Sequence, residues 1–262
     1  MPTRYLDEIV VAHRRRAARD ERDWRARREA TVPRVPRLRA ALRSSTVAVI
    51  AEVKRRSPSR GTLAADLDPA QVAREYRDGG AAAISVLTDE AFFGGSLADL
   101  GAVAAAVDVP LLRKDFAVSP NDVLDAATWG ASGVLLIVAA LNPAELAALV
   151  SLAREIGLDP LVEVHDADEL ARALDAGADL IGINQRDLHT FAVEPERAAA
   201  LAQRVDPAVV LVAESGIRGR HDATTLARAG IDALLVGESV VTAANRRDAV
   251  RALTGITRIP RG

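Results

Sequence analysis

Eight repeats of an apolar run followed by a helical stretch constrain the fold of this 262-residue chain more than any other feature. Each run is short and rich in Val, Ile, Leu and Ala, which predicts a buried strand. The runs are Val47–Lys54, Ala82–Thr88, Pro110–Phe116, Gly133–Ala140, Pro160–His165, Leu180–Arg186, Val209–Ser215 and Ala233–Ser239. Buried strands that alternate with helices are parallel and joined by crossovers.

The stretches between the runs carry the start and stop signals of helices. Proline follows a capping side chain in Asp68-Pro69, Ser119-Pro120 and Asn142-Pro143, and glycine ends several stretches. Helices are expected at Pro69–Asp78, Leu97–Val107, Asn121–Trp129, Pro143–Ile156, Ala167–Asp175, Pro195–Val205, Ala223–Ala229 and Arg247–Leu253. Eight units favour an α/β fold of the (β/α)8 barrel type over an open doubly wound sheet. No Gly-x-Gly-x-x-Gly follows the first strand, which weakens a dinucleotide-binding fold.

The residues before the first strand predict a helical extension of the same domain. We expect one domain over residues 1–262, with the extension at 1–46 and the barrel at 47–262. A stripe of Leu6, Ile9, Val10, Ala17 and Trp24 among many arginines predicts an amphipathic helical segment, followed by a linker over 31–36 and a short helix over 37–43. That stripe must be buried, and the mouth of the barrel is the expected place. We also expect a chain without residues 1–43 to fold.

Charge and composition exclude several classes of partner. The formal net charge is −2, so no global field favours nucleic acid or a membrane. Arg14-Arg15-Arg16 is interspersed with acidic neighbours, which is more typical of a solvated helix face than of a nucleic-acid contact. The absence of cysteine is compatible with a reducing compartment, and no signal-peptide core or membrane-spanning run is present. We expect a soluble cytoplasmic protein, a monomer or a weak homodimer.

Polar side chains gather where the predicted strands end. Active sites of (β/α)8 barrels lie at the carboxyl ends of the strands. Here those ends carry Glu52, Lys54, Lys114, Glu163, His165, Asn184, Arg186, Glu214, Ser215 and Glu238. Any one of these groups could form a structural ion pair. Unpaired charges are too costly to bury in a core, so together they indicate a wet or ligand-filled mouth.

The lysines are the strongest candidates for proton transfer. Lys54 and Lys114 are the only lysines among the 34 Lys and Arg residues, and all the others are arginine. Arginine stays protonated in proteins, whereas a buried lysine can be tuned to release its proton. Glu52 and Lys54 lie two residues apart, so they share the strand face of Ile50. Lysines and glutamates in one mouth allow proton donation and abstraction, because clustering separates their pKa values.

Two further features of the mouth predict an anion site and an apolar slot. Ser215-Gly216 and Gly237-Glu238 offer backbone amides and close approach to a phosphate, with the Ser57 hydroxyl as a further donor; glycine that simply ends a strand is the alternative. Phe92, Phe93 and Phe116 could hold a planar ring, or pack within loops. No cluster has metal-ligand spacing. His165 is expected to support its neighbours by hydrogen bonding, and His13 and His189 have no assigned role.

These motifs together resemble the indole-3-glycerol phosphate synthase family, from the N-terminal helix to the last barrel unit. The segments that carry the resemblance are Ile50–Ser59, Phe92–Leu97, Leu112–Phe116, Leu135–Leu141, Val162–His165, Asn184–Leu188 and Ala213–Ile217. Two segments depart from the family pattern. Arg56 and Arg60 replace smaller or lysine residues, and Val240–Ala243 lacks the usual Leu-Met-Arg-like run.

The resemblance implies a lyase of tryptophan biosynthesis that needs no cofactor or metal. Its small phosphorylated substrate, 1-(2-carboxyphenylamino)-1-deoxyribulose 5-phosphate, closes its ring and loses carbon dioxide and water. By resemblance, Lys114 is the general acid of ring closure. Lys54 pairs with the substrate carboxylate and is a second candidate proton donor. Glu163 is the base or acid of the dehydration, and Glu52 supports it.

The remaining assignments also follow the family. The resemblance implies that Asn184, Arg186 and Glu214 orient the substrate, and that Phe93 and Phe116 contact the aryl ring. It implies that the phosphate is held by Ser57, Ser215, Gly216, Gly237 and Glu238. Two other functions stay open at this point. One is a sugar-phosphate isomerase on another phosphate-binding barrel. The other is a non-catalytic paralogue that binds the same phosphate ligand.

Overall fold

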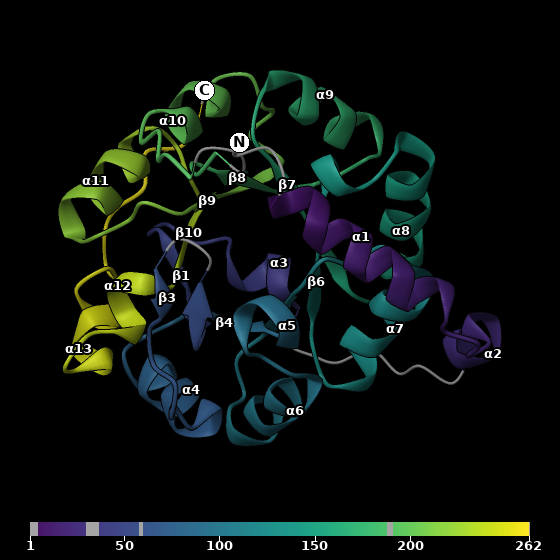
Figure 1. The fold of residues 1–262 in the computed structure, drawn as a ribbon. Helices are drawn as coiled ribbons and strands as arrows, with labels where there is room; N and C mark the ends of the chain where they lie inside the picture. Colours follow the sequence, from purple (N-terminus) through teal and green to yellow (C-terminus); the bar gives the residue numbers. More distant parts are fainter. Residues whose placement is uncertain (1–4, 30–36, 58–59, 188–190, 262) are drawn as a thin grey trace.

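The computed structural model describes residues 5–29, 37–57, 60–187 and 191–261. Eight parallel strands close into a barrel in the order β1-β10-β9-β8-β7-β6-β5-β4, so each strand pairs with its neighbour along the chain (Figure 1). The strands are β1 (Ala48–Val53), β4 (Ala83–Leu87), β5 (Leu111–Lys114), β6 (Gly133–Ile137), β7 (Asp159–Val164), β8 (Leu180–Asn184), β9 (Val210–Glu214) and β10 (Ala233–Val236). All eight predicted strands are present, and the (β/α)8 barrel is confirmed.

Helices on the outside of the barrel follow the strands along the chain. They are α4 (Pro69–Asp78), α6 (Leu97–Ala106), α7 (Pro120–Thr128), α8 (Pro143–Glu155), α9 (Ala167–Asp175), α10 (Arg197–Ala202), α11 (Arg220–Arg228) and α13 (Arg246–Arg251). The predicted starts are explained by their caps. Asp68 accepts the Ala70 and Gln71 amides at the start of α4, and capping boxes begin α7 and α8.

Short elements at the barrel mouth were not predicted. The apolar runs after β6 and β10 turn into the 3-10 helix η1 (Val138–Ala140) and the helix α12 (Glu238–Val241), so these strands are shorter than the runs. The helix α5 (Glu90–Phe93) follows β4, and β2 (Arg56–Ser57) pairs with β3 (Gly61–Thr62) as a small hairpin after β1. These elements are four residues or fewer, which is too short for hydrophobic periodicity to reveal.

The barrel interior and the strand–helix layer form separate apolar cores. Because side chains alternate along a strand, one face of each strand fills the barrel and the other packs under the helices. The inner core includes Ile50, Leu112, Leu135, Leu161, Val212 and Leu235. The outer core includes Val49, Ala51 and Val53 from the opposite face of β1. Ile50 therefore points inward, as do Glu52 and Lys54 above it.

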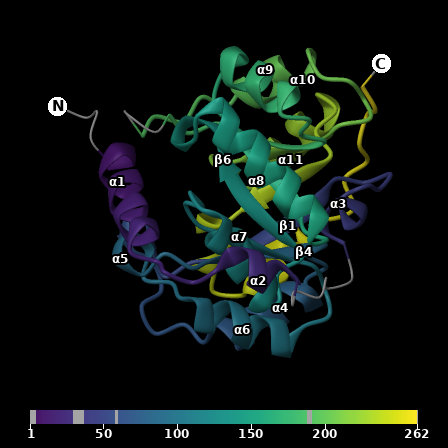
Figure 2. The same ribbon diagram turned by 90° about the vertical axis from the view of Figure 1, so that its right-hand side faces the viewer.

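The N-terminal segment contacts both ends of the barrel. It forms α1 (Tyr5–Ala18), α2 (Trp24–Glu29) and α3 (Leu38–Ala41), whereas the predicted linker lies outside the described residues. Figure 2 shows α1 on one side of the strands and α3 on the other. Leu6 and Ile9 of α1 are buried over the mouth, as predicted. Arg22 and Arg27 pair with Asp125 of α7 and fix the region of α2 to the barrel.

The helix α3 closes the opposite end of the barrel. Leu38 and Leu42 are fully buried in the inner core, and a Cβ at Gly133 of β6 would lie 2.5 Å from Leu38 Cδ2. Asp159 at the start of β7 accepts hydrogen bonds from the Arg37 side chain and the Arg39 amide. The extension therefore does not lie over the carboxyl face alone. A chain without residues 1–43 would lose both leucines, so we expect the truncated barrel to be less stable than the full chain.

Replacing Leu38 by alanine is expected to destabilise the barrel by about 3 kcal/mol. Removal of a fully buried leucine loses transfer free energy and leaves a cavity, and such substitutions cost about 2–5 kcal/mol. Urea denaturation followed by circular dichroism measures the change. Val11→Ala is a suitable control, because Val11 on α1 is 45% exposed and its replacement should change the free energy of unfolding by less than about 0.5 kcal/mol. Equal stability of both variants would contradict the closing role of α3.

Candidate active site

A cavity of about 580 Å³ lies at the carboxyl ends of the strands, beneath α1. Every residue that the family resemblance assigned to the site lines it, whereas Phe92, a further candidate for the apolar slot, does not. The assigned residues are Glu52, Lys54, Ser57, Phe93, Lys114, Phe116, Glu163, Asn184, Arg186, Glu214, Ser215, Gly216, Gly237 and Glu238. The wall also contains Phe191, Val193 and Ile217, which sequence reasoning missed. Phe191 is one of only four phenylalanines in the chain, and that scarcity was a signal that could have marked it.

Lys114 stands between two glutamates at the centre of the cavity. Its Nζ lies 3.2 Å from Glu163 Oε2 and 3.5 Å from Glu214 Oε2. Burial disfavours the charged form of Lys114, but the surrounding carboxylates outweigh burial and raise its pKa above the ordinary value. Lys114 is therefore an ammonium group, which is the form required of a proton donor.

The two glutamates beside Lys114 differ in protonation. Burial alone would raise the pKa of Glu163. The Lys114 ammonium, the His165 ring and Asn184 Nδ2, which donates to Glu163 Oε1 at 3.2 Å, together outweigh burial and hold the pKa below its usual range. Burial raises the pKa of Glu214 to about 8. The contact with Lys114 is too weak to offset this effect of burial, and the nearby Glu163 carboxylate disfavours a negative charge on Glu214. Near neutral pH the site thus offers one carboxylate and one carboxylic acid.

Lys54 is paired within its own strand. Its Nζ lies 2.7 Å from Glu52 Oε1, and both side chains face the cavity. A Cβ at Gly237 would lie 2.5 Å from Glu52 Oε1 and 2.9 Å from Lys54 Nζ. In the same way, a Cβ at Gly182 of β8 would lie 2.2 Å from Glu214 Oε1. Glycine at these inward positions therefore leaves room for the ionisable side chains of neighbouring strands.

His165 supports Glu163 from the neighbouring turn. Its Nε2 lies 3.4 Å from Glu163 Oε1 and its Nδ1 lies 3.0 Å from Glu169 Oε2. Burial opposes a charge on the ring, but the two glutamates outweigh burial and raise the pKa of His165 from 6.5 to about 10. His165 is absent from the cavity wall, which agrees with a supporting position rather than a catalytic one.

The pKa of His165 predicts a pH dependence of stability. The folded state keeps this proton up to about pH 10, whereas the unfolded chain releases it near pH 6.5. The contribution of His165 to the free energy of unfolding is therefore complete below pH 6.5. It is lost as the pH rises to 10, by at most about 1.4 kcal/mol per pH unit. Urea unfolding of the parent and of His165→Asn at pH 6 and pH 9 measures it. We expect the parent to lose more stability than the variant over this range, and an equal loss would contradict the assignment.

The opposite end of the cavity has the features of an anion site. Ser57 Oγ is buried and has no hydrogen-bond partner among the described residues. Ser215 and Gly216 follow β9 with φ values of 67° and 75°, a left-handed turn that glycine favours at its second position. Arg60 Nε lies 3.0 Å from Glu238 Oε1, so the Glu238 carboxylate is paired at the rim.

The structure shows that Gly216 lies against a neighbouring loop as well as against the predicted anion site. A Cβ there would lie 2.4 Å from Val193 Cγ1, so a side chain at this position would press on the loop after β8. Substitution of Gly216 would therefore disturb the backbone as well as any bound anion. Ser57 is a cleaner position at which to test the anion site.

Two phenylalanines face each other across the apolar part of the cavity. The rings of Phe93 and Phe116 have centroids 6.2 Å apart and are tilted by 34°. Leu135 and Ile137 of β6 and Leu87 of β4 extend this apolar wall. A planar ring bound here would lie close to Lys114, which precedes Phe116 by two residues.

The hairpin after β1 is tied to this apolar side. Arg55 pairs with Asp99 of α6, and the Arg56 guanidinium donates to the Glu90 and Ala91 carbonyls of α5. Arg56 and Arg60, which depart from the family pattern, thus make ordered contacts at opposite ends of the hairpin.

One group of described residues has side chains close enough to share a metal ion. Ligand atoms of His13, Asp89 and Asp115 lie within 4.8 Å of one another. His13 Nε2 is 2.9 Å from Asp89 Oδ2, which is the distance of a hydrogen bond, and Asp115 already accepts from the Thr88 hydroxyl. The group therefore fits a hydrogen-bonded cluster, and its members come from three separate elements, which no sequence spacing could reveal.

No helix within the described part of the chain is long and apolar enough to cross a bilayer.

Comparison with known proteins gives a consistent result over nearly the whole chain. A family profile described as "Indole-3-glycerol phosphate synthase" matches residues 6–253. An indole-3-glycerol phosphate synthase of Parafrankia sp. (strain EAN1pec) is 52% identical over 252 residues, which cover 95% of this chain and 94% of that protein. The enzyme of the same name from Streptomyces griseus is 50% identical over 252 residues, with the same shares covered.

A solved structure supports the fold alone. The thiamine phosphate pyrophosphorylase of Pyrococcus furiosus superposes with a TM-score of 0.61 at 20% identity, covering 84% of this chain and 97% of that one.

Proposed function

This chain belongs to the indole-3-glycerol phosphate synthase family, and from that premise we propose how its cavity performs the reaction. The enzyme is a carboxy-lyase of tryptophan biosynthesis. It closes the ring of 1-(2-carboxyphenylamino)-1-deoxyribulose 5-phosphate and releases carbon dioxide and water, which gives indole-3-glycerol phosphate. The observation that carries the proposal is the placement of Lys114 as an ammonium between one ionised and one protonated glutamate.

Lys114 is the general acid of ring closure in this proposal. The aryl carbon attacks the substrate ketone, and the ketone oxygen must receive a proton as its carbonyl bond breaks. The ammonium group of Lys114 can deliver that proton. Loss of carbon dioxide from the attacking aryl carbon then restores the aromatic ring. Lys54, already paired with Glu52, meets the substrate carboxylate and is the second candidate donor.

Glu163 is the base of the dehydration. Its low pKa keeps it ionised, so it can remove a proton from the ring-closed substrate. The hydroxyl group takes a proton from an ammonium group of the site, for which Lys54 is the candidate, and leaves as water. Asn184 donates to Glu163 and accepts the Arg186 amide, and these contacts support its orientation. Glu214 is protonated near neutral pH and can donate a hydrogen bond to a substrate hydroxyl. We assign Asn184, Arg186 and Glu214 to substrate orientation and Glu52 to support of Lys54.

The substrate lies between the aromatic and hydroxyl-lined ends of the cavity. Phe93 and Phe116 contact the aryl ring at the apolar end. At the other end Ser57, Ser215 and the amides of Gly216, Gly237 and Glu238 hold the phosphate. The proposal is supported by the buried Ser57 hydroxyl, which has no partner among the described residues and would be satisfied by a phosphate oxygen.

Ser57→Ala is expected to weaken phosphate binding about tenfold without loss of stability. The hydroxyl makes no internal hydrogen bond in the described structure, whereas a hydrogen bond to a charged oxygen is worth about 1.5–3 kcal/mol. Inhibition of turnover by inorganic phosphate measures the effect. Ser132→Ala is the matched control, because Ser132 also carries a buried hydroxyl without a described partner but lies at the start of β6, away from the cavity. If both variants respond to phosphate as the parent does, the anion site lies elsewhere.

Addition of the substrate to the purified protein tests the function directly. We expect indole fluorescence to appear with release of carbon dioxide. Binding without fluorescence would favour the non-catalytic paralogue, and turnover of simple sugar phosphates without indole fluorescence would favour an isomerase.

We further infer a cytoplasmic enzyme that is a monomer or a weak homodimer. The exposed large apolar side chains among the described residues support a monomer or a weak homodimer, because Val11, Trp129, Leu174 and Ile259 lie singly on separate elements.

A further inference from the structure

Two buried aspartates hold the backbone of the proposed aryl slot. Asp89 Oδ1 accepts the amides of Phe92 and Phe93 at 2.5 and 3.1 Å and thereby caps α5. Asp115 Oδ1 accepts the amide of Phe116 at 2.8 Å. Each slot phenylalanine is thus fixed at its own amide by one carboxylate. The separation of the two rings depends on the separation of these carboxylates.

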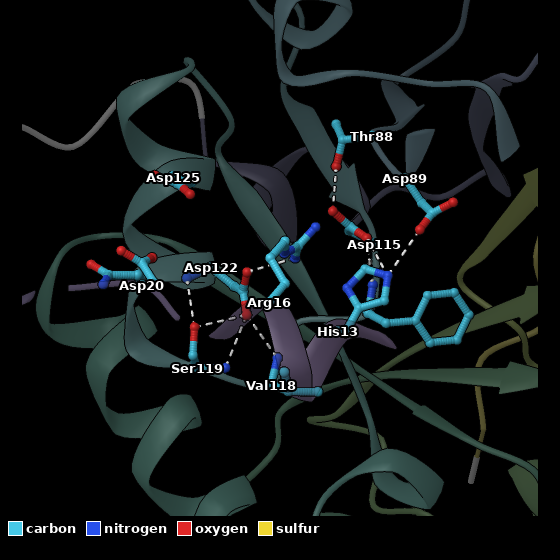
Figure 3. A network of polar contacts seen from close by, with 12 residues as sticks. His13, Arg16, Asp20, Thr88, Asp89, Asp115, Val118, Ser119, Asp122 and Asp125 are labelled. Atoms are coloured by element: carbon cyan, nitrogen blue, oxygen red, sulfur yellow. Dashed lines mark hydrogen bonds and ion pairs between the residues drawn. The ribbon is translucent and has the colours of Figure 1, made fainter. Parts of the chain in front are cut away.

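His13 of α1 lies between the two carboxylates (Figure 3). Its Nε2 is 2.9 Å from Asp89 Oδ2 and 3.7 Å from Asp115 Oδ1, and only 3% of the residue is exposed. A carboxylate only accepts hydrogen bonds, so Nε2 carries the proton and donates. The imidazole also packs on Phe116, with ring centroids 5.6 Å apart. One side chain of the N-terminal helix therefore contacts both supports of the slot.

The barrel itself fixes only one side of this arrangement. Asp115 Oδ2 accepts from Thr88 Oγ1 at 2.8 Å and pairs with Arg113 at 2.6 Å, and all three residues belong to the barrel. Asp89 lies in the turn before α5, where its second oxygen meets His13. Loss of the His13 contact would leave a buried carboxylate oxygen without that donor, and such a group shifts toward water or another partner.

We propose that His13 is a positioning residue, which sets the spacing of Phe93 and Phe116 through Asp89 and Asp115 and so links the N-terminal helix to aryl recognition. This inference rests on the proposed function, because it takes the two phenylalanines as the aryl slot. His13 does not line the cavity, so it acts through these residues and not on the substrate. The N-terminal helix is then part of substrate recognition as well as a cover.

Two polar substitutions of His13 distinguish a role in hydrogen bonding to Asp89 from a role in packing alone. Glutamine can place its amide nitrogen near the position of Nε2 and donate to Asp89, whereas asparagine reaches only as far as Nδ1. His13→Asn should lose the contact and His13→Gln should keep it. Arg14→Ala is the matched control on the same helix. Arg14 anchors α1 to Glu145 of α8 through paired hydrogen bonds of 2.8 Å and has no contact with either aspartate.

The readouts are inhibition of turnover by 2-aminobenzoate, a probe for the slot, and by inorganic phosphate, a probe for the other end. For His13→Asn we expect the inhibition constant of 2-aminobenzoate to rise at least fivefold and that of phosphate to stay within twofold. His13→Gln and Arg14→Ala should keep both constants within twofold of the parent. This pattern would support positioning, because general loosening of α1 would affect Arg14→Ala as well.

Several results would overturn the inference. It fails if His13→Asn keeps the parent inhibition constants, if His13→Gln behaves as His13→Asn does, or if Arg14→Ala shows the same selective loss. Phe116→Leu identifies the source of a failure. If that variant weakens 2-aminobenzoate and His13→Asn does not, the slot stands and the role of His13 is wrong. If neither variant changes the constant, the slot assignment fails and this inference fails with it. Absence of turnover in the parent would instead reject the proposed function.

Discussion

Replacement of Lys114 by arginine is expected to lower turnover by about two to four orders of magnitude, the usual contribution of general acid–base catalysis. Arginine keeps the positive charge between Glu163 and Glu214 but holds its proton too tightly to deliver it. Substrate binding should be retained in part, because the anion site and the aryl slot are unchanged. The rate of indole fluorescence at saturating substrate gives the loss of turnover, and titration of the variant with substrate gives its affinity.

Lys54→Arg is the matched comparison, since Lys54 is the one other lysine in the chain. Lys54 pairs with Glu52 at 2.7 Å and meets the substrate carboxylate in our proposal, a role that arginine can take over. We expect this variant to lose less turnover than Lys114→Arg. Near-normal turnover of Lys114→Arg would remove Lys114 from the acid role. A larger loss in Lys54→Arg would assign that role to Lys54.

Glu163→Gln is expected to reduce formation of indole-3-glycerol phosphate by a similar factor, about two to four orders of magnitude. The amide keeps the size of the side chain and can still meet Lys114, but it cannot accept a proton. Ring closure and decarboxylation precede the dehydration, so carbon dioxide should be released ahead of indole fluorescence in a single turnover. Parallel measurement of both products in rapidly mixed samples detects this separation.

Glu169→Gln controls for the change of charge near His165. Glu169 lies 3.0 Å from His165 on the side away from Glu163 and does not line the cavity. Its variant should keep turnover within about threefold of the parent, because Glu169 reaches Glu163 only through His165 and touches no reacting group. If carbon dioxide and fluorescence appear together and slowly in Glu163→Gln, the residue acts before decarboxylation and not in the dehydration.

The sequence by itself determined the order of the elements and the residues that face the cavity. The period of two residues in a strand and of 3.6 residues in a helix is set by the local backbone geometry. Both periods can therefore be recognised in the sequence before the fold is known. Ile50 therefore located Glu52 and Lys54 on the inward face of β1, and the structure agrees. The motif resemblance supplied the reaction, which the family membership supports.

Only the tertiary structure decided which side chains meet. Closure of the barrel places Gly237 against Glu52 and Gly182 against Glu214, so these glycines make room for charges on neighbouring strands. It also surrounds Glu163 with Lys114, His165 and Asn184, whereas Glu214 meets only Lys114 among the described groups that lower its pKa, and this difference separates the protonation of two chemically identical groups. Such contacts depend on stagger and distance between residues far apart in the chain, which no local period contains.

The N-terminal segment shows most clearly what the sequence determined and what only the tertiary structure decided. Its apolar stripe predicted burial over the mouth, and Leu6 and Ile9 are buried there. The stripe could not predict that α3 would close the opposite end, because Leu38 and Leu42 have the same hydrophobic character at either end of a barrel. Nor could it give His13 a partner, because the carboxylates it meets come from residues 76 and 102 positions further along the chain (89 − 13 and 115 − 13). Hydrophobicity determines that a side chain is buried, and only the closed barrel determines what it is buried against.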